Sequence, residues 1–274
     1  MTQHVIDIQA GKVFGRYLDD LWRYRELALF MAWRDVLVRY KQTAIGVLWV
    51  VLRPLLMAVA FVFVFSKVAG LSSGPVPYLL FVLAGMLPWQ FFASAVSVCS
   101  ESVTGNAGMV TKIYFPRLLL PVSAMLSTLL DFLVTLPLLA AVMVWYGVAP
   151  GPQLPLALVF LILIALLAVG LGALLAALNV FYRDFRYVVP FLVQFGLYVS
   201  PVGFGLHAVP EQWRLLYCLN PMAGLLDGLR WALLDTPLLV PPAGMALSVV
   251  MCLLVFALGV RSFIRMERDF VDVI

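Results

Sequence analysis

The chain has 274 residues, of which 64% are hydrophobic and 12% are charged, and its formal net charge is +4. A water-soluble domain is closer to a quarter charged, so this composition excludes most soluble functions. Six apolar windows each approach the roughly 20 residues that a helix needs to cross a bilayer core. They cover residues 45–65, 78–98, 122–144, 157–178, 187–206 and 243–260. We therefore expect an all-α integral membrane protein with six transmembrane helices.

The segment before the first window, residues 15–41, combines apolar and charged side chains. Its apolar positions recur at roughly helical spacing, and they are Leu18, Leu21, Trp22, Leu29, Trp33, Val36, Leu37 and Tyr40. This pattern predicts an amphipathic helix, broken at most once, that lies in the cytoplasmic interface of the membrane. Such a helix can be a plain surface anchor or a platform for a soluble partner.

The segment between the second and third windows, residues 101–121, carries turn formers followed by a basic and aromatic cluster. Gly105 and Gly108 permit a sharp turn, and Pro116 stops a helix. The cluster consists of Lys112, Tyr114, Phe115 and Arg117. Because this connection is longer than a simple turn requires, we expect it to contain a short cytoplasmic helix.

The segment between the fifth and sixth windows, residues 207–242, is far from polar. It contains two amphipathic pieces, 211–219 and 222–234, which the breaker Asn220-Pro221 separates. Non-helical backbone at membrane depth persists only against protein or water. We therefore expect external helices that lie in the outer interface or form a re-entrant hairpin.

Lys and Arg are distributed unevenly between the two sides that six spans would define. Fourteen of the eighteen lie before the first window, in the two intervening loops on that side, or after the last window. The other side holds only Lys67, Arg214 and Arg230. The positive-inside rule therefore places both termini in the cytoplasm, including the tail 261–274. The net charge reflects this topology and does not indicate nucleic acid.

We expect residues 1–274 to form one membrane domain, with its six spans between 45 and 260.

Two ionisable residues lie within the spans. Arg53 is about 12 Å along the helix from residue 45, so its guanidinium can extend toward the cytoplasm. Asp131 is about 21 Å along the helix from Arg117, which predicts a position near mid-membrane. An intramembrane carboxylate is a candidate functional group, for example a proton site, although a structural hydrogen bond to a neighbouring helix explains it equally well.

Several chemical motifs are missing from the sequence. It has no G-x-x-x-x-G-K-[ST] loop, so the chain does not bind ATP through a P-loop. The two histidines, His4 and His207, fall on opposite sides of the expected membrane, and the three cysteines have no metal-binding spacing. We therefore expect neither a catalytic residue nor a metal site in this chain.

Three segments together resemble the permease subunits of bacterial ABC exporters of the type-two, polysaccharide-export class, most closely those that export O-antigen. They are RDVLVRYKQTAIGVLWVVLRPLL at 34–56, NAGMVTKIYFPRLLLP at 106–121 and NVFYRDFRYVVPFLVQFGLYVSPVGF at 179–204. The C-terminal MERDFVDVI is similar to the usual ending of this family. Arg53 departs from the uncharged residue expected at its position.

The resemblance implies a homodimer in the bacterial inner membrane that works with two copies of a separate nucleotide-binding subunit. ATP and Mg would bind to that subunit, and no cofactor would bind to this chain. The transported molecule would be a lipid-linked polysaccharide, and membrane lipids would surround the dimer. The N-terminal amphipathic helix and the loop around Lys112 would transmit the ATPase motion, through Trp22, Arg25, Arg34, Lys112, Tyr114 and Phe115.

A path for a sugar chain should offer aromatic rings and few charges, because sugars present hydroxyl groups and apolar ring faces. The candidates in the first and fifth spans are Phe61, Phe65, Phe195 and Tyr198, with Asp131 as a candidate polar site. Two rival functions remain. One is a type-two exporter of another substrate, such as a capsular polysaccharide, teichoic acid, lipid or drug. The other is a membrane enzyme or secondary carrier that needs no ATPase partner.

Overall fold

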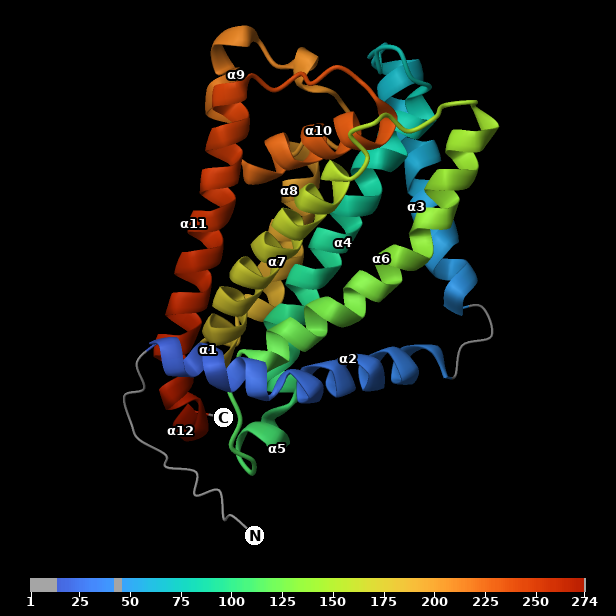
Figure 1. Cartoon of the computed structure of the whole chain (residues 1–274). Coiled ribbons are helices and arrows are strands. Elements are labelled where there is room, and N and C mark those ends of the chain that lie inside the picture. The colour runs from blue at the N-terminus through green and yellow to red at the C-terminus, as the bar shows by residue number, and fades with distance from the viewer. Residues whose placement is uncertain (1–13, 42–45, 274) are drawn as a thin grey trace.

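The computed structural model describes residues 14–41 and 46–273, and over these ranges the chain forms helices and no strands (Figure 1). Lys12 and the beginning of the first expected span, at residue 45, lie outside the described residues. The longer helices are α3 (Gly46–Phe61) with its π-helical continuation η1 (Val62–Val68), α4 (Tyr78–Gly105), α6 (Leu119–Trp145), α7 (Leu156–Phe181) and α11 (Pro242–Met266). The shorter ones are α1 (Phe14–Arg23), α2 (Arg25–Tyr40), α5 (Ala107–Val110), α8 (Phe185–Val199), η2 (Leu206–Ala208), α9 (Glu211–Tyr217), α10 (Pro221–Leu234), η3 (Glu267–Asp269) and α12 (Phe270–Val273).

The long helices form a bundle whose two ends differ. We call the end with α1, α2, α5 and α12 the basal end, and the end with α9 the apical end (Figure 1). The chain ascends in α3, descends in α4, ascends in α6, descends in α7, ascends in α8 and descends in α11. α4 lies at the centre, and its residues 80–89 are all buried. α7 packs beside α4 and crosses α11 where Gly170 and Gly259 meet, a position without room for a side chain.

Five of the helical segments are long and apolar enough to cross a membrane. The expected fifth span, 187–206, is shorter in the structure, because α8 ends at Val199 after 15 residues. Its length is about 22 Å, which is less than a bilayer core of about 30 Å. The cause is local: Ser200 has an extended backbone, as is usual for a residue that precedes proline, here Pro201. The six-span count is therefore not confirmed by helix length.

The backbone that follows the end of α8 is hydrogen-bonded to one buried cation, the guanidinium of Arg230. Arg230 of α10 is 2% exposed, and its guanidinium donates hydrogen bonds to the carbonyl oxygens of Pro201 (2.7 Å), Val202 (2.6 Å) and Phe81 (3.2 Å). Its Cζ lies 3.9 Å from the centre of the Phe81 ring. A side chain at Gly85 would collide with this guanidinium. The charge count assigned Arg230 only to a side of the membrane, and the structure adds that its side chain is buried, where it donates to backbone carbonyls after the end of α8.

The two amphipathic pieces expected between the last spans correspond to α9 and α10. Asn220 caps α10 by accepting a hydrogen bond from the backbone N–H of Met222 (3.1 Å), and Pro221 occupies the first turn. Asp227 on α10 accepts hydrogen bonds from the N–H groups of Leu239 and Val240, both at 2.9 Å. α10 is buried along nearly its whole length, so it is part of the bundle and not a surface belt.

The basal end has its own apolar cluster. It joins α1, α2, the α5–α6 connection, α7, α11 and α12 around Tyr17, Phe115, Phe263 and Phe270. The expected N-terminal helix is broken once, at Tyr24, between α1 and α2. The expected helix between the second and third spans is reduced to the four residues of α5, and Lys112 and Tyr114 follow it in exposed, non-helical backbone.

Replacing Arg230 by Met should lower the midpoint of thermal unfolding in detergent strongly. The substitution leaves the carbonyl oxygens of Pro201 and Val202 without donors, and each unpaired buried acceptor costs about 1–3 kcal/mol. Arg230→Lys should recover only part of the loss, because an ammonium lacks the planar fork of donors. The control is Arg214→Met, which removes one hydrogen bond to Val209 and an exposed ion pair with Glu211. Equal midpoints for the two Met variants would contradict this role.

Candidate functional site

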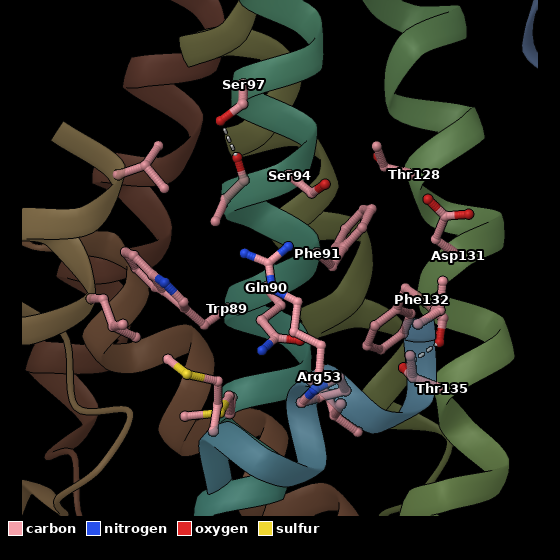
Figure 2. A pocket seen from close by; sticks show the side chains of 18 of the residues that line it. Arg53, Trp89, Gln90, Phe91, Ser94, Ser97, Thr128, Asp131, Phe132 and Thr135 are labelled. Atoms are coloured by element: carbon pink, nitrogen blue, oxygen red, sulfur yellow. Dashed lines mark hydrogen bonds between the residues drawn. The ribbon is translucent and has the colours of Figure 1, made fainter. Parts of the chain in front are cut away.

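A cavity of about 740 Å³ opens between α3, α4, α6 and α8, and we call it the central cavity. Its polar lining groups are those of Gln90, Ser94, Ser97, Thr128, Thr135 and Gln194. Figure 2 shows that Gln90, Ser94 and Ser97 project from successive turns of α4, with Thr128 and Asp131 opposite them on α6. The central helix α4, which is buried along residues 80–89, therefore presents a polar stripe to the cavity from residue 90 onward.

The polar stripe on α4 continues toward the basal end. Ser97 also lines a second cavity of about 280 Å³, the basal cavity, together with Asp35, Glu101 and Asn106. The spacing from Gln90 through Ser97 to Glu101 keeps these residues on one face of α4. The two cavities thus follow one another along a single helix face, from the basal end into the interior of the bundle.

Aromatic rings form much of the remaining wall of the central cavity. They belong to Trp49, Trp89, Phe91, Phe132 and Tyr198. Phe91 of α4 and Phe132 of α6 pack together, with ring centres 5.4 Å apart. The combination of flat apolar faces with amide and hydroxyl groups suits a molecule that has both apolar faces and many hydrogen-bonding groups.

Asp131 is held by α2, the helix that lies along the basal end. Arg39 forms an ion pair with one carboxylate oxygen, and the Tyr40 hydroxyl donates to the other at 2.6 Å. Burial and the Asp131 carboxylate beside it raise the pKa of Tyr40 to about 12, so its hydroxyl remains a donor at neutral pH. Counting residues along α6 placed Asp131 near mid-membrane. That depth stays a prediction; the structure adds that α6 runs obliquely above α2, which brings this carboxylate within reach of the end of α2 (Figure 1).

Arg53 projects from α3 and lines the central cavity together with Gln90 and Phe91 of α4 (Figure 2). Its side chain is exposed to the cavity, and it makes no hydrogen bond or ion pair with any residue that the structure describes. Pro54, the next residue, lies inside α3 and is buried. The cavity therefore contains a cation that its own walls do not neutralise.

A further polar cluster at the basal end was not anticipated from the sequence. Tyr17 of α1 donates a hydrogen bond to the Glu267 carboxylate (2.6 Å), and Arg117 donates to the Glu267 carbonyl oxygen. Burial, with Glu267 beside it, raises the pKa of Tyr17 well above its ordinary value. The cluster joins the N-terminal helix, the connection before α6 and the C-terminal end. Only its separate aromatic and basic residues were visible in the sequence.

Comparison with known proteins identifies the family. Residues 26–234 match the family model described as ABC-2 type transporter. The chain belongs to the ABC-2 type transporter family. It is 28% identical over 244 residues to the O-antigen export system permease protein RfbA of Myxococcus xanthus, covering 88% of this chain and 93% of that protein. It is 29% identical to RfbA of Klebsiella pneumoniae, over 75% of this chain and 78% of that protein. The polysialic acid transport protein KpsM of Escherichia coli is 23% identical, over 76% and 80% respectively.

The four aromatic residues expected along a substrate path are not brought together in this ABC-2 transporter chain. Tyr198 lines the central cavity. Phe61 and Phe65 pack against each other, with ring centres 5.3 Å apart, and against the backbone of Gly203. Phe195 is 56% exposed on α8 and stacks on Phe191. Of these four expected residues, Tyr198 lines the central cavity and the other three do not.

The residues expected to contact an ATPase subunit fall into two groups. Trp22 is 72% exposed at the basal end, and the Arg25 guanidinium stacks on its ring. Lys112 and Tyr114 are also exposed there. In contrast, Phe115 is 4% exposed within the basal apolar cluster, and Arg34 binds Asp35 and the side chain of Asn106. Within the described residues of this ABC-2 chain, no three His, Cys, Asp or Glu side chains are placed to hold a metal ion.

A double-mutant cycle tests whether Arg39 and Asp131 stabilise the contact between α2 and α6. Arg39→Gln and Asp131→Asn should each lower the midpoint of thermal unfolding, because each leaves a partly buried charge or a hydroxyl without its partner. The double variant should lose less than the two single effects added together, with a coupling energy of about 1 kcal/mol. Tyr40→Phe, measured in each background, separates the hydroxyl contribution. Strict additivity of Arg39→Gln and Asp131→Asn would show that the pair does not stabilise the fold.

Proposed function

We propose that this chain is the transmembrane subunit of an exporter that moves a lipid-linked polysaccharide, most specifically O-antigen, across the bacterial inner membrane. The observation that carries the proposal is the central cavity, whose amide and hydroxyl groups alternate with aromatic walls. Sugars bind proteins through these two kinds of contact, since their hydroxyl groups form hydrogen bonds and their ring faces stack on aromatic rings. The similarity to two O-antigen export permeases over most of the chain supports the same substrate class.

The energy for export would come from ATP hydrolysis in a separate nucleotide-binding subunit, present in two copies with bound ATP and Mg. The absence of a P-loop from this sequence supports that division of labour. The contact surface would be the exposed basal group of Trp22, Arg25, Lys112 and Tyr114. Arg34 and Phe115 would support this surface from within. Arg34 fixes α2 to the end of α4, and Phe115 anchors the loop in the basal cluster.

Six crossings with both termini in the cytoplasm remain the topology that we propose. α8 and the turn 200–205 together return the chain from the basal to the apical end (Figure 1). The contacts of Tyr17 and Arg117 with Glu267 hold the N-terminal helix and the C-terminal end on the same side, which requires an even number of crossings. The basic residues at the basal end then face the cytoplasm. On this view residues 1–274 form one membrane domain.

The functional unit would be a homodimer, because one bundle is too small to enclose a polymer-wide path. α8 supports this proposal, since it presents an aromatic stripe that its own bundle leaves exposed. The stripe consists of Tyr187, Phe191, Phe195 and Tyr198. Its last member also lines the central cavity, so a second copy placed against α8 would extend the same wall.

A capsular polysaccharide is the second candidate substrate, and the similarity to KpsM favours it. The lower identity to KpsM makes O-antigen the better supported of the two. Export of either polysaccharide would use the same polar and aromatic cavity and would need an ATPase subunit.

Reconstitution into proteoliposomes tests the proposed function. The purified chain alone should hydrolyse no ATP. Together with its nucleotide-binding subunit, it should hydrolyse ATP and move lipid-linked polysaccharide to the leaflet opposite the ATPase, where a lectin added on that side detects it. Transport that needs a proton gradient but no ATPase subunit would instead support a secondary carrier.

Tyr114→Ala tests the coupling surface without disturbing the interior, because this ring is half-exposed. Loss of about 1.5 kcal/mol of apolar contact should weaken association with the nucleotide-binding subunit about tenfold, as measured by titration in detergent. The matched control is Tyr146→Ala, a similarly exposed tyrosine near the apical end of α6. Equal affinity of the two variants would mean that the loop is only a connector. Phe115→Ala should act differently, by lowering the stability of the chain itself.

A further inference from the structure

Arg53 leaves the central cavity with an uncompensated positive charge. The only carboxylate on the cavity wall among the described residues, Asp131, has both oxygens occupied by Arg39 and Tyr40. Glu101 lies on the same face of α4 but about 16 Å along the helix from Gln90, in the basal cavity. A guanidinium within a membrane-spanning helix is costly unless it meets a counter-charge or water, and an intramembrane charge that faces a cavity is a candidate binding group.

Two neutral groups in the lining of the same cavity are also without partners among the described residues. The side chains of Gln90 and Ser94 line the same cavity, and neither makes a hydrogen bond with any residue in the described part of the chain. Ser97, one turn further along α4, differs because its hydroxyl donates to the Ala93 carbonyl oxygen at 2.8 Å. Figure 2 shows Arg53 and Gln90 among the side chains that line the cavity, with Ser94 one turn away from Gln90 on α4.

These three groups share one chemistry. A guanidinium, an amide N–H and a hydroxyl are all donors, and the planar guanidinium matches the two oxygens of a carboxylate or a phosphate. The geometry points to a binding site, formed by Arg53, Gln90 and Ser94, for an anionic oxygen group on the carbohydrate that enters the central cavity. This inference rests on the proposed function, and it adds charge selectivity to it.

Two parts of a lipid-linked polysaccharide can supply such a group. One is the carboxylate of an acidic sugar unit, and the other is the phosphate that joins the sugar to its lipid. Both would approach Arg53 along the polar stripe of α4, with sugar rings against the exposed rings of Trp49 and Tyr198. Because the shared chemistry is an anionic oxygen group, probes that carry only one of the two sources distinguish them.

The test uses the permease with its nucleotide-binding subunit in nanodiscs of phosphatidylcholine, which contain no anionic lipid. Met57→Cys provides the reporter, since Met57 is exposed on α3 and lines the cavity, whereas the native cysteines Cys99, Cys218 and Cys252 are buried. The rate of labelling by a water-soluble maleimide is measured in the presence of one probe at a time. The probes are an oligogalacturonate, a matched neutral oligogalactose, a polyprenyl diphosphate and the corresponding polyprenol. Protection by each probe gives its apparent affinity.

At least one anionic probe should protect the reporter at a concentration at least tenfold lower than its neutral counterpart. Preference for oligogalacturonate assigns the site to an acidic sugar, and preference for the polyprenyl diphosphate assigns it to the lipid anchor. Arg53→Gln should abolish the preference, and Arg53→Lys should retain part of it. Arg261→Gln, which removes an exposed charge from α11 outside the cavity, should leave the preference unchanged.

The outcomes separate this inference from the proposed function. If the neutral oligosaccharide protects and export proceeds, but charge has no effect or Arg53→Gln preserves the preference, the anionic site is refuted and the exporter stands. If no carbohydrate probe protects and reconstituted export also fails, the proposed function is refuted. Thermal unfolding midpoints for both Arg53 variants establish that a lost preference does not reflect a lost fold.

Discussion

The hydrogen bonds of Arg230 to three backbone carbonyls are the interaction on which the rest of this fold depends. In a bilayer, an unpaired carbonyl has no water to bind, so a helix cannot end within the membrane region unless protein groups satisfy its backbone. α8 ends early because Pro201 imposes an extended conformation on Ser200. Arg230 supplies the missing donors to Pro201 and Val202. A single buried cation therefore permits a helix break that the lipid environment would otherwise forbid.

Arg230 also positions the cavity. The Arg230 guanidinium donates to the Phe81 carbonyl and lies against Gly85, so this side chain joins α10 and the turn after α8 to the central helix α4. α8 and α4 are two of the four walls of the central cavity. Asp227, one turn before Arg230 on α10, fixes the chain that leads into α11 through Leu239 and Val240. One short buried helix thus sets the relative positions of α4, α8 and α11, and the width of the cavity follows from it.

The basal end connects the surface proposed for the ATPase subunit to the cavity. α2 carries exposed groups near its beginning, whereas Arg39 and Tyr40 near its end hold Asp131 in the cavity wall. A rigid helix of 16 residues therefore links the exposed surface to α6. The contacts of Tyr17 and Arg117 with Glu267 join the N- and C-terminal segments, so a force applied to α1 also reaches α11. These contacts give a physical route for coupling in an ABC-2 transporter.

The sequence by itself determined the helical class, the approximate positions of the long helices and the two amphipathic helices before α11, because apolar run length, proline breakers and helical spacing are local properties. It also located the charged residues, but not their partners. The burial of Arg230 and the pairing of Asp131 with Arg39 and Tyr40 were not anticipated, since counting along the chain ignores helix tilt and packing. The polar stripe of α4 was present in the sequence at 90, 94 and 97, yet nothing local distinguished it from helix packing. Only the tertiary structure decided that Asp131 is paired with Arg39 and Tyr40 whereas Arg53 faces the central cavity, because pairing depends on helices distant in sequence.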